Sequence, residues 1–224
     1  MSALPPDLKA RVLQAARAQP SPTRAGARTL SWLVLPSSVI VAGSIYFTFG
    51  GPEHGAGRAS WFYVASTLGW AAVAALSAWS VLARSRSATG RPTSALWAIA
   101  AGTPAALFAL MFGLVLIEPT ATLLHAELVG YRCFGLTVAA AAFPLIALLF
   151  VRRGTDAVHP VASGAALGAA CGASAGVMVE MWCPVAAPAH VAFGHVLPIV
   201  LLAVLGALLG MRALAIRAKP RATE

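Results

Sequence analysis

Side chains that bind soft metal ions gather in the last third of the chain, where one long apolar segment ends and the next begins. Cys183, His190 and His195 follow one another there within a short stretch. Thiolate and imidazole are ligands that Zn²⁺ and Cu⁺ favour in proteins. We expect ordinary packing at these positions and no bound cofactor, and a metal or redox site on these three residues is the alternative.

More soft ligands lie near the ends of the neighbouring apolar segments. Cys133 belongs to the preceding segment, and a disulfide with Cys183 could form in an oxidising compartment. Cys171 lies about 18 Å before Cys183 along a helix, which is too deep for the two to share a site. Three further side chains of this kind are Met178, Met181 and His125.

A G-x-S-x-G pattern, typical of hydrolase nucleophiles, is centred on Ser174. It lies inside a long apolar segment and not at the strand-to-helix turn where the motif functions. An intramembrane serine protease with His195 as its base is the enzyme hypothesis that the pattern allows. Because the sequence contains no H-E-x-x-H, Walker or dinucleotide-binding pattern, we expect the protein not to be an enzyme.

The composition places these residues in a membrane protein. Of the 224 residues, 59% are hydrophobic and 10% are charged, whereas soluble domains carry about 25% charged residues. The net charge of +9 is spread over short segments between the apolar runs. Basic residues in such places orient a chain in the bilayer and contact anionic headgroups. We therefore expect a lipid bilayer as partner and no direct binding of nucleic acid.

Six apolar stretches are each long enough to cross about 30 Å of hydrocarbon as a helix. They predict an all-α membrane protein, a six-transmembrane-helix bundle in residues 30–214, preceded by a tail of residues 1–29 and followed by a basic tail of residues 215–224. Prolines inside the spans predict kinks at Pro104, Pro144 and Pro198. The predicted spans are Leu30–Gly50, Trp61–Leu82, Ala95–Ile117, Cys133–Phe150, Val161–Met181 and Val191–Leu214.

Positive charges divide unevenly between the two ends of these spans. Of the 16 lysines and arginines, only Arg58 and Arg132 fall on one side. The others lie in the two tails and in alternate connections. Under the positive-inside rule the basic side is cytoplasmic, so both termini are predicted in the cytoplasm of a bacterial inner-membrane protein. Cys133 and Cys183 then lie near the periplasmic face.

Four glycines recur at every fourth position of the fifth predicted span. On a helix such residues form one stripe, which lets a neighbouring helix approach closely. Tight packing inside the bundle is the interpretation that we expect, and self-association through the stripe is the alternative. The four residues are Gly164, Gly168, Gly172 and Gly176.

The N-terminal tail predicts a short amphipathic helix. Asp7 is suited to its first turn, and Leu4, Leu8 and Val12 recur every four residues with Leu13 beside them. A helix of about 12 residues is marginal alone in water. It would gain order by docking in a groove of a partner protein, or by lying on the inner leaflet, and the pattern leaves both open.

These features together resemble the NrsF-type family of bacterial integral-membrane anti-sigma factors. The resemblance covers the tail, the six spans and the segment from Gly168 to Gly210, where Cys183-Pro184, His195 and Pro198 are the most specific positions. The sequence most resembles a member that restrains light-induced carotenoid synthesis in myxobacteria.

The resemblance implies a function and a partner. Such proteins hold an extracytoplasmic-function sigma factor at the membrane and repress transcription until light or oxidative stress inactivates them. Cys171 and Cys183 match positions at which the family carries cysteines that could sense the stress. The sequence has no soluble zinc-binding anti-sigma domain of the H-x3-C-x2-C kind. Sigma binding would therefore fall to the tail, with the inner loops as a second contact.

Overall fold

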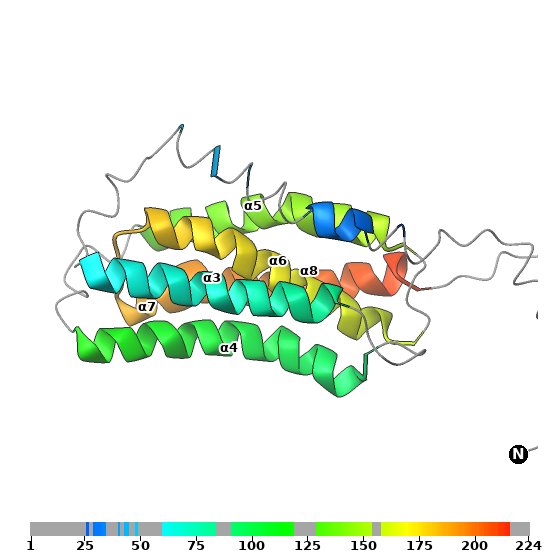
Figure 1. Ribbon diagram of the computed structural model, residues 1–224, viewed down its shortest axis with the longest axis horizontal. Helices are drawn as coiled ribbons and strands as arrows, with labels where there is room; N and C mark the ends of the chain where they lie inside the picture. Colours follow the sequence, from blue (N-terminus) through cyan, green and yellow to red (C-terminus); the bar gives the residue numbers. More distant parts are fainter. Residues whose placement is uncertain are drawn as a thin grey trace, which may run out of the picture.

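The computed structural model describes residues 26, 29–34, 40, 43–44, 48, 60–83, 91–118, 129–153 and 158–215, and most of them are helical. The helices run in alternating directions along one long axis (Figure 1). Their bounds are α3 Ser60–Leu82, α4 Thr93–Ile117, α5 Val129–Val151, α6 Pro160–Trp182, α7 Pro188–His190, the π-helix η3 Val191–Val196 and α8 Leu197–Ala213.

Within the described ranges, five helices are long and apolar enough to cross a membrane. The last of them joins α7, η3 and α8 into one segment, Pro188–Ala213. These five correspond to the second through sixth predicted spans, so the all-helical class and these five long apolar helices are confirmed. Their ends agree with the predicted ends to within a few residues, because apolar runs bounded by polar connections define membrane helices well.

The predicted first span, Leu30–Gly50, lies largely outside the described residues. Those of its residues that are described are helical. The Ser44 hydroxyl donates to the Ile40 carbonyl at 2.8 Å, and the Thr48 hydroxyl donates to the Ser44 carbonyl at 2.7 Å, as on one face of a helix. The first predicted span, and with it the total of six spans, therefore stays a prediction.

Both predicted tails also lie outside the described part of the chain, apart from a few residues at their inner ends. The N-terminal amphipathic helix and the boundaries of the three predicted domains remain sequence-based predictions. The predicted sigma-binding residues outside the described part are Leu4, Leu8, Val12 and Leu13.

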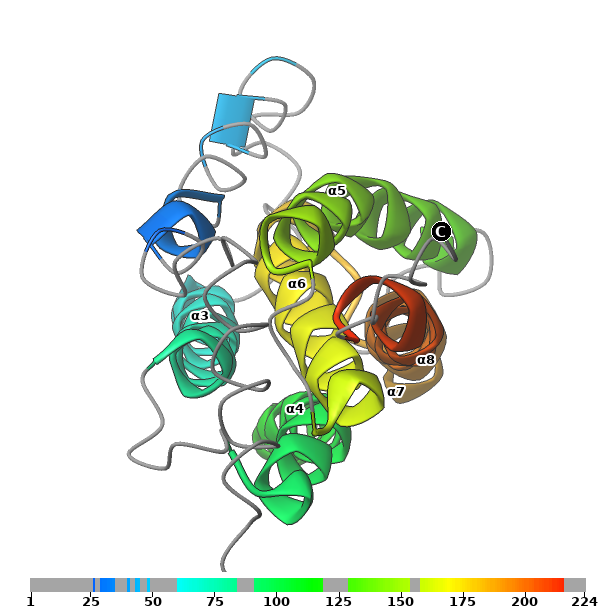
Figure 2. The same ribbon diagram turned by 90° about the vertical axis from the view of Figure 1, so that its right-hand side faces the viewer.

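Helix α6 forms the centre of the bundle. In Figure 2 it lies between α3, α4, α5 and α8. In its most apolar 18-residue window 72% of residues are buried, against 33–44% in the other four spans. The small side chains of α6 leave room for four neighbours, because glycine and alanine let helix backbones approach closely.

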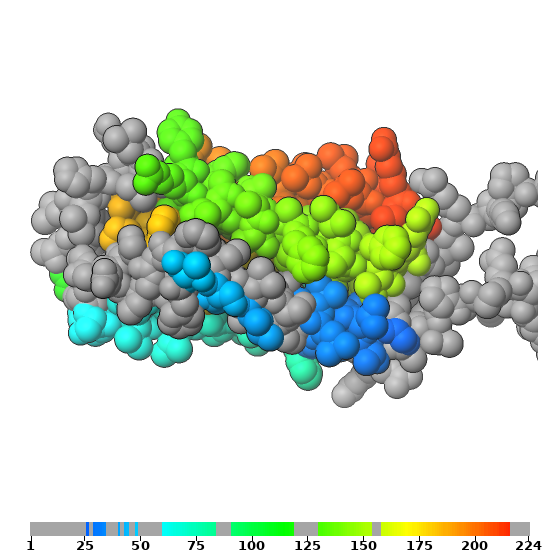
Figure 3. Space-filling view, turned by 90° about the horizontal axis from the view of Figure 1, so that it is seen from above, coloured from blue at the N-terminus to red at the C-terminus, as the bar shows by residue number. Residues whose placement is uncertain are grey.

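A described helical segment, residues 29–34, covers part of the bundle beside α3 and α5 (Figure 3). The indole of Trp32 contacts that of Trp79 on α3, with ring centroids 5.4 Å apart. Trp32 and Val34 also pack against the apolar cluster between α3, α5 and α6. The start of the predicted first span is thus held to the bundle by aromatic and aliphatic contacts.

The glycine stripe of α6 faces α8 over most of its length. A Cβ atom added to Gly164 would overlap the carbonyl oxygen of Gly206, and one added to Gly168 would overlap the carbonyl oxygen of Leu202. The contact is mutual, because a Cβ atom added to Gly206 would overlap the carbonyl oxygen of Gly164. Backbone therefore lies against backbone here, and no larger residue fits without separating the two helices.

The other two glycines of the stripe have different neighbours. A Cβ on Gly172 would lie 3.1 Å from Cα of Ile199 on α8. A Cβ on Gly176 would lie 2.7 Å from Nε1 of Trp70, so this end of the stripe faces α3. The stripe is thus occupied by neighbours from the same chain. The Trp70 indole N–H also donates to the Ala173 carbonyl at 3.1 Å and fixes α3 against α6.

Candidate metal centre

Four buried ligand side chains converge at the end of the bundle where α6 ends and α7 begins. They are Cys133, Cys183, His190 and His195, named the thiol–imidazole tetrad below. One ligand atom from each lies within 4.8 Å of each of the other three. Sγ of Cys183 is 3.1 Å from Nε2 of His190. The most exposed of the four, His190, is only 3% exposed.

Three separate segments supply these side chains. Cys133 lies in the first turns of α5. Cys183 directly follows α6, where the backbone becomes extended, and its N–H closes the last helical turn on the Val179 carbonyl at 2.9 Å. His190 ends α7 and His195 lies in η3. The tetrad therefore joins the start of α5 to the connection between α6 and α8.

The π-helical turn η3 places the two histidines on one face. In an α-helix, residues five apart differ by about 140° around the axis, so His190 and His195 would point apart. A π-turn is wider, with hydrogen bonds from i to i+5, and the N–H of Leu197 indeed donates to the Ala192 carbonyl. The two imidazole centroids are 5.3 Å apart.

Pro198 gives a physical reason for the π-turn. It lies in the first turn of α8, directly after η3. A proline inside a helix has no N–H to donate, and its ring clashes with the carbonyl four residues earlier, here that of Gly194. Widening the preceding turn relieves this clash. The proline that the sequence predicts to kink the last span thus lies where the helix changes its hydrogen-bond register.

A close approach of two backbones brings Cys133 to the histidines. A Cβ on Gly194 would lie 3.1 Å from the Gly130 carbonyl oxygen and 3.2 Å from Cβ of Cys133. Side-chain contacts in proteins are rarely so short. Glycine at position 194 therefore lets η3 pack directly against the first turn of α5.

Several polar atoms in this cluster have no hydrogen-bond partner within the described part of the chain: Nδ1 of His190 and both ring nitrogens of His195. Oε2 of Glu180 on α6 lies 3.6 Å from Nδ1 of His195, beyond hydrogen-bond length. Burying a polar atom without a partner costs about 1–3 kcal/mol. Buried polar atoms without a partner call for an explanation, and a bound ion or water molecule is one.

The environment of Cys183 favours its thiolate. Hydrogen bonds with Cys133 and His190 lower the pKa of the Cys183 thiol and outweigh burial, which raises it. Thiolate is the form of cysteine that binds metal ions. Apolar side chains enclose this group, with Val179 and Val185 buried beside the cysteines and Met178 packed against them.

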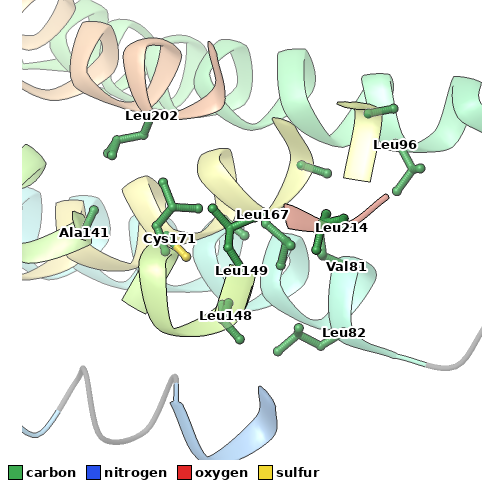
Figure 4. Packing of buried hydrophobic residues seen from close by; sticks show 14 of the residues in the cluster. Val81, Leu82, Leu96, Ala141, Leu148, Leu149, Leu167, Cys171, Leu202 and Leu214 are labelled. Atoms are coloured by element: carbon green, nitrogen blue, oxygen red, sulfur yellow. The ribbon is translucent and has the colours of Figure 1, made fainter. Parts of the chain in front are cut away.

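Other residues that the sequence suggested as functional are not part of the thiol–imidazole tetrad. Cys171 is fully buried in an apolar cluster with Leu167 and Leu202, and it is not part of the tetrad (Figure 4). The Ser174 hydroxyl donates to the Ala170 carbonyl one turn earlier at 2.8 Å. His125 lies outside the described residues.

The sequence grouped Cys183, His190 and His195 as a possible site and gave Cys133 as a possible disulfide partner of Cys183, and the structure brings all four together. The position of Cys133 at the outer end of a predicted span was the available signal. Glu180 is fully buried next to His195. Glu180 could have been recognised in the sequence because it is an acidic residue inside an apolar segment. Such a position is costly unless the carboxylate has a role.

The fold and the site define a multi-pass helical membrane protein with a buried thiol–imidazole tetrad at one end of its bundle. The sequence matches NrsF, negative regulator of sigma F, over residues 15–215. The chain belongs to this family and is a membrane-embedded negative regulator of a sigma factor, as the sequence resemblance predicted. No curated protein matches the chain, and no solved structure matches it.

Proposed function

We propose that the protein is an anti-sigma factor of the bacterial inner membrane that sequesters an extracytoplasmic-function sigma factor. The match to the negative regulators of sigma F over residues 15–215 carries this proposal. The distribution of basic residues supports an orientation with both termini in the cytoplasm, where a sigma factor is found. Holding the sigma factor at the membrane keeps it from core polymerase and from the nucleoid.

The N-terminal tail is the proposed sigma-binding element. Its apolar stripe of Leu4, Leu8 and Val12, with Leu13 beside it, suits the docking of a helix in a groove. The family match begins at residue 15, after this stripe.

The proposed target genes are those of light-induced carotenoid synthesis. This part of the proposal rests on the resemblance to a family member with that role. Light or an oxidative signal would end repression by inactivating the membrane protein. Exposure to the inducing light should then have no further effect in a strain that lacks this chain, because the target genes are already expressed.

A double substitution tests the tail. Leu8→Asp with Val12→Asp puts two charges on the apolar stripe, so it should abolish repression of a sigma-dependent reporter while membrane insertion is retained. Burying two carboxylates in an apolar groove costs several kcal/mol, which corresponds to at least a hundredfold loss of sigma binding.

The matched control carries the same charges on the other face of the helix. Ala10→Asp with Gln14→Asp should leave repression near the wild-type level, and immunoblots of the membrane fraction should show equal amounts of all three proteins. Full repression by the Leu8 and Val12 variant at equal abundance would exclude the stripe as the binding element.

A further inference from the structure

We propose that Cys133, Cys183, His190 and His195 bind one Zn²⁺ ion in a closed tetrahedral site. The proposal concerns metal binding by the chain itself and holds whether or not the tail binds a sigma factor. It rests on the convergence of four buried ligand atoms from three segments and on Nε2 of His195, a buried ring nitrogen that has no hydrogen-bond partner among the described residues.

The distances are close to those of a tetrahedral zinc site. With zinc–sulfur bonds of about 2.3 Å and zinc–nitrogen bonds of about 2.0–2.1 Å, ligand atoms lie about 3.3–3.8 Å from one another. In the tetrad all four ligand atoms lie within 4.8 Å of one another. Side-chain movements of about 1 Å would complete the coordination without any change in the helices.

The kind of ligand selects the metal. Two thiolates and two imidazoles in a tetrahedral arrangement are typical of zinc. Ca²⁺ and Mg²⁺ need oxygen ligands, which the tetrad does not offer. Two thiolates also cancel the double charge of Zn²⁺, so the ion and its four ligands together carry no net charge. This compensation matters because most of the surrounding side chains are apolar, and an ion buried among them without counter-charges would be costly.

Glu180 is suited to orient one of the ligands. Its Oε2 lies 3.6 Å from Nδ1 of His195, and a small rotation of the ring would make this a hydrogen bond. A carboxylate on one ring nitrogen commonly fixes a histidine that binds zinc through the other nitrogen. We assign Glu180 as a positioning residue, with Nε2 of His195 as the zinc ligand.

A bound ion would connect parts of the bundle that are distant in the sequence. It would tie the start of α5 to Cys183 at the end of α6 and to η3 at the start of the last span. The residues of η3 touch α5 closely at Gly130 and Gly194. Loss of the ion would therefore loosen this junction first, while the glycine contacts between α6 and α8 remain.

The test is to purify the full-length chain in mild detergent from cells grown with added zinc, and to measure zinc per chain by mass spectrometry. One Zn²⁺ per chain is expected in the wild type and in the control variant Cys171→Ser, whose thiol lies outside the tetrad. Cys133→Ser and Cys183→Ser should each lower the zinc content at least tenfold. Unchanged zinc in both tetrad variants, or none in the wild type, would overturn the proposal.

A second measurement needs no substitution, so it does not depend on whether a variant folds. Metal-free wild-type protein is titrated with Co²⁺ alone. The expected result is a thiolate-to-cobalt charge-transfer band and tetrahedral d–d bands that saturate at one equivalent and disappear when Zn²⁺ is added. A folded protein without these bands would contradict the site. A disulfide between Cys133 and Cys183 in protein taken from zinc-grown cells would contradict it as well.

Discussion

Replacing Gly168 by alanine should destabilise the bundle, although alanine is the better helix former. Its Cβ would lie 2.6 Å from the carbonyl carbon of Leu202 and 3.0 Å from Cα of Ala203. Ordinary contacts between carbon atoms are about 3.5–4.0 Å long. The obstacles are backbone atoms, so no side-chain rotation relieves the contact, and α6 and α8 must separate by about 1 Å.

The expected size follows from two opposing terms. Overpacking of this kind costs about 1–3 kcal/mol, and a backbone obstacle favours the upper end of that range. Replacing a glycine inside a helix by alanine stabilises the folded state by about 0.5–1 kcal/mol. The free energy of unfolding of Gly168→Ala should therefore fall by about 2 kcal/mol.

The control is Gly102→Ala in α4, where an added Cβ would have no atom within 4 Å. This change should leave the free energy of unfolding unchanged or raise it by up to about 1 kcal/mol. Both variants and the wild type are unfolded in mixed micelles with a rising fraction of sodium dodecyl sulfate, and circular dichroism follows the helix content. Equal stability of the Gly168 and Gly102 variants would refute the close packing of α6 on α8.

Two further substitutions test individual contacts. Glu180→Gln should weaken zinc binding about 10–100-fold in competition with a chromophoric chelator, because an amide is a weaker acceptor than a carboxylate for the ring N–H of His195; an unchanged affinity would show that the side chain of Glu180 has no part in the site. Ser77→Ala removes the 2.7 Å hydrogen bond to Thr103 between α3 and α4 and should lower the free energy of unfolding by about 0.6 kcal/mol in the same micelles. No loss of stability would show that each hydroxyl is satisfied by its bond within its own helix.

The sequence was sufficient to predict the helices because each is an apolar run bounded by polar connections. The bilayer allows few backbone conformations other than helix, so an apolar run of this length leaves little choice. Pro160–Trp182 shows the limit of this reasoning. Its small residues indicate close packing, but nothing in their spacing says that α8 faces Gly164 while α3 faces Gly176.

The tetrad was predictable only in part. Cys183, His190 and His195 lie near one another in the sequence, and so they could be grouped without a structure. Their convergence depends on the π-turn η3, and sequence periodicity assumes a regular α-helix in which two of the three point apart. The inclusion of Cys133 depends on the contact between Gly130 and Gly194, a tertiary contact that no local pattern records.

Co-purification shows whether the chain holds a sigma factor and whether its N-terminal tail is needed for this. The tagged chain and a version without residues 2–28 are isolated from their native membranes in mild detergent, and the bound proteins are identified by mass spectrometry. We predict an extracytoplasmic-function sigma factor with the full-length chain and none with the truncated one. A well-folded full-length chain that carries no sigma factor, from cells in which the sigma factor is present, would contradict the account.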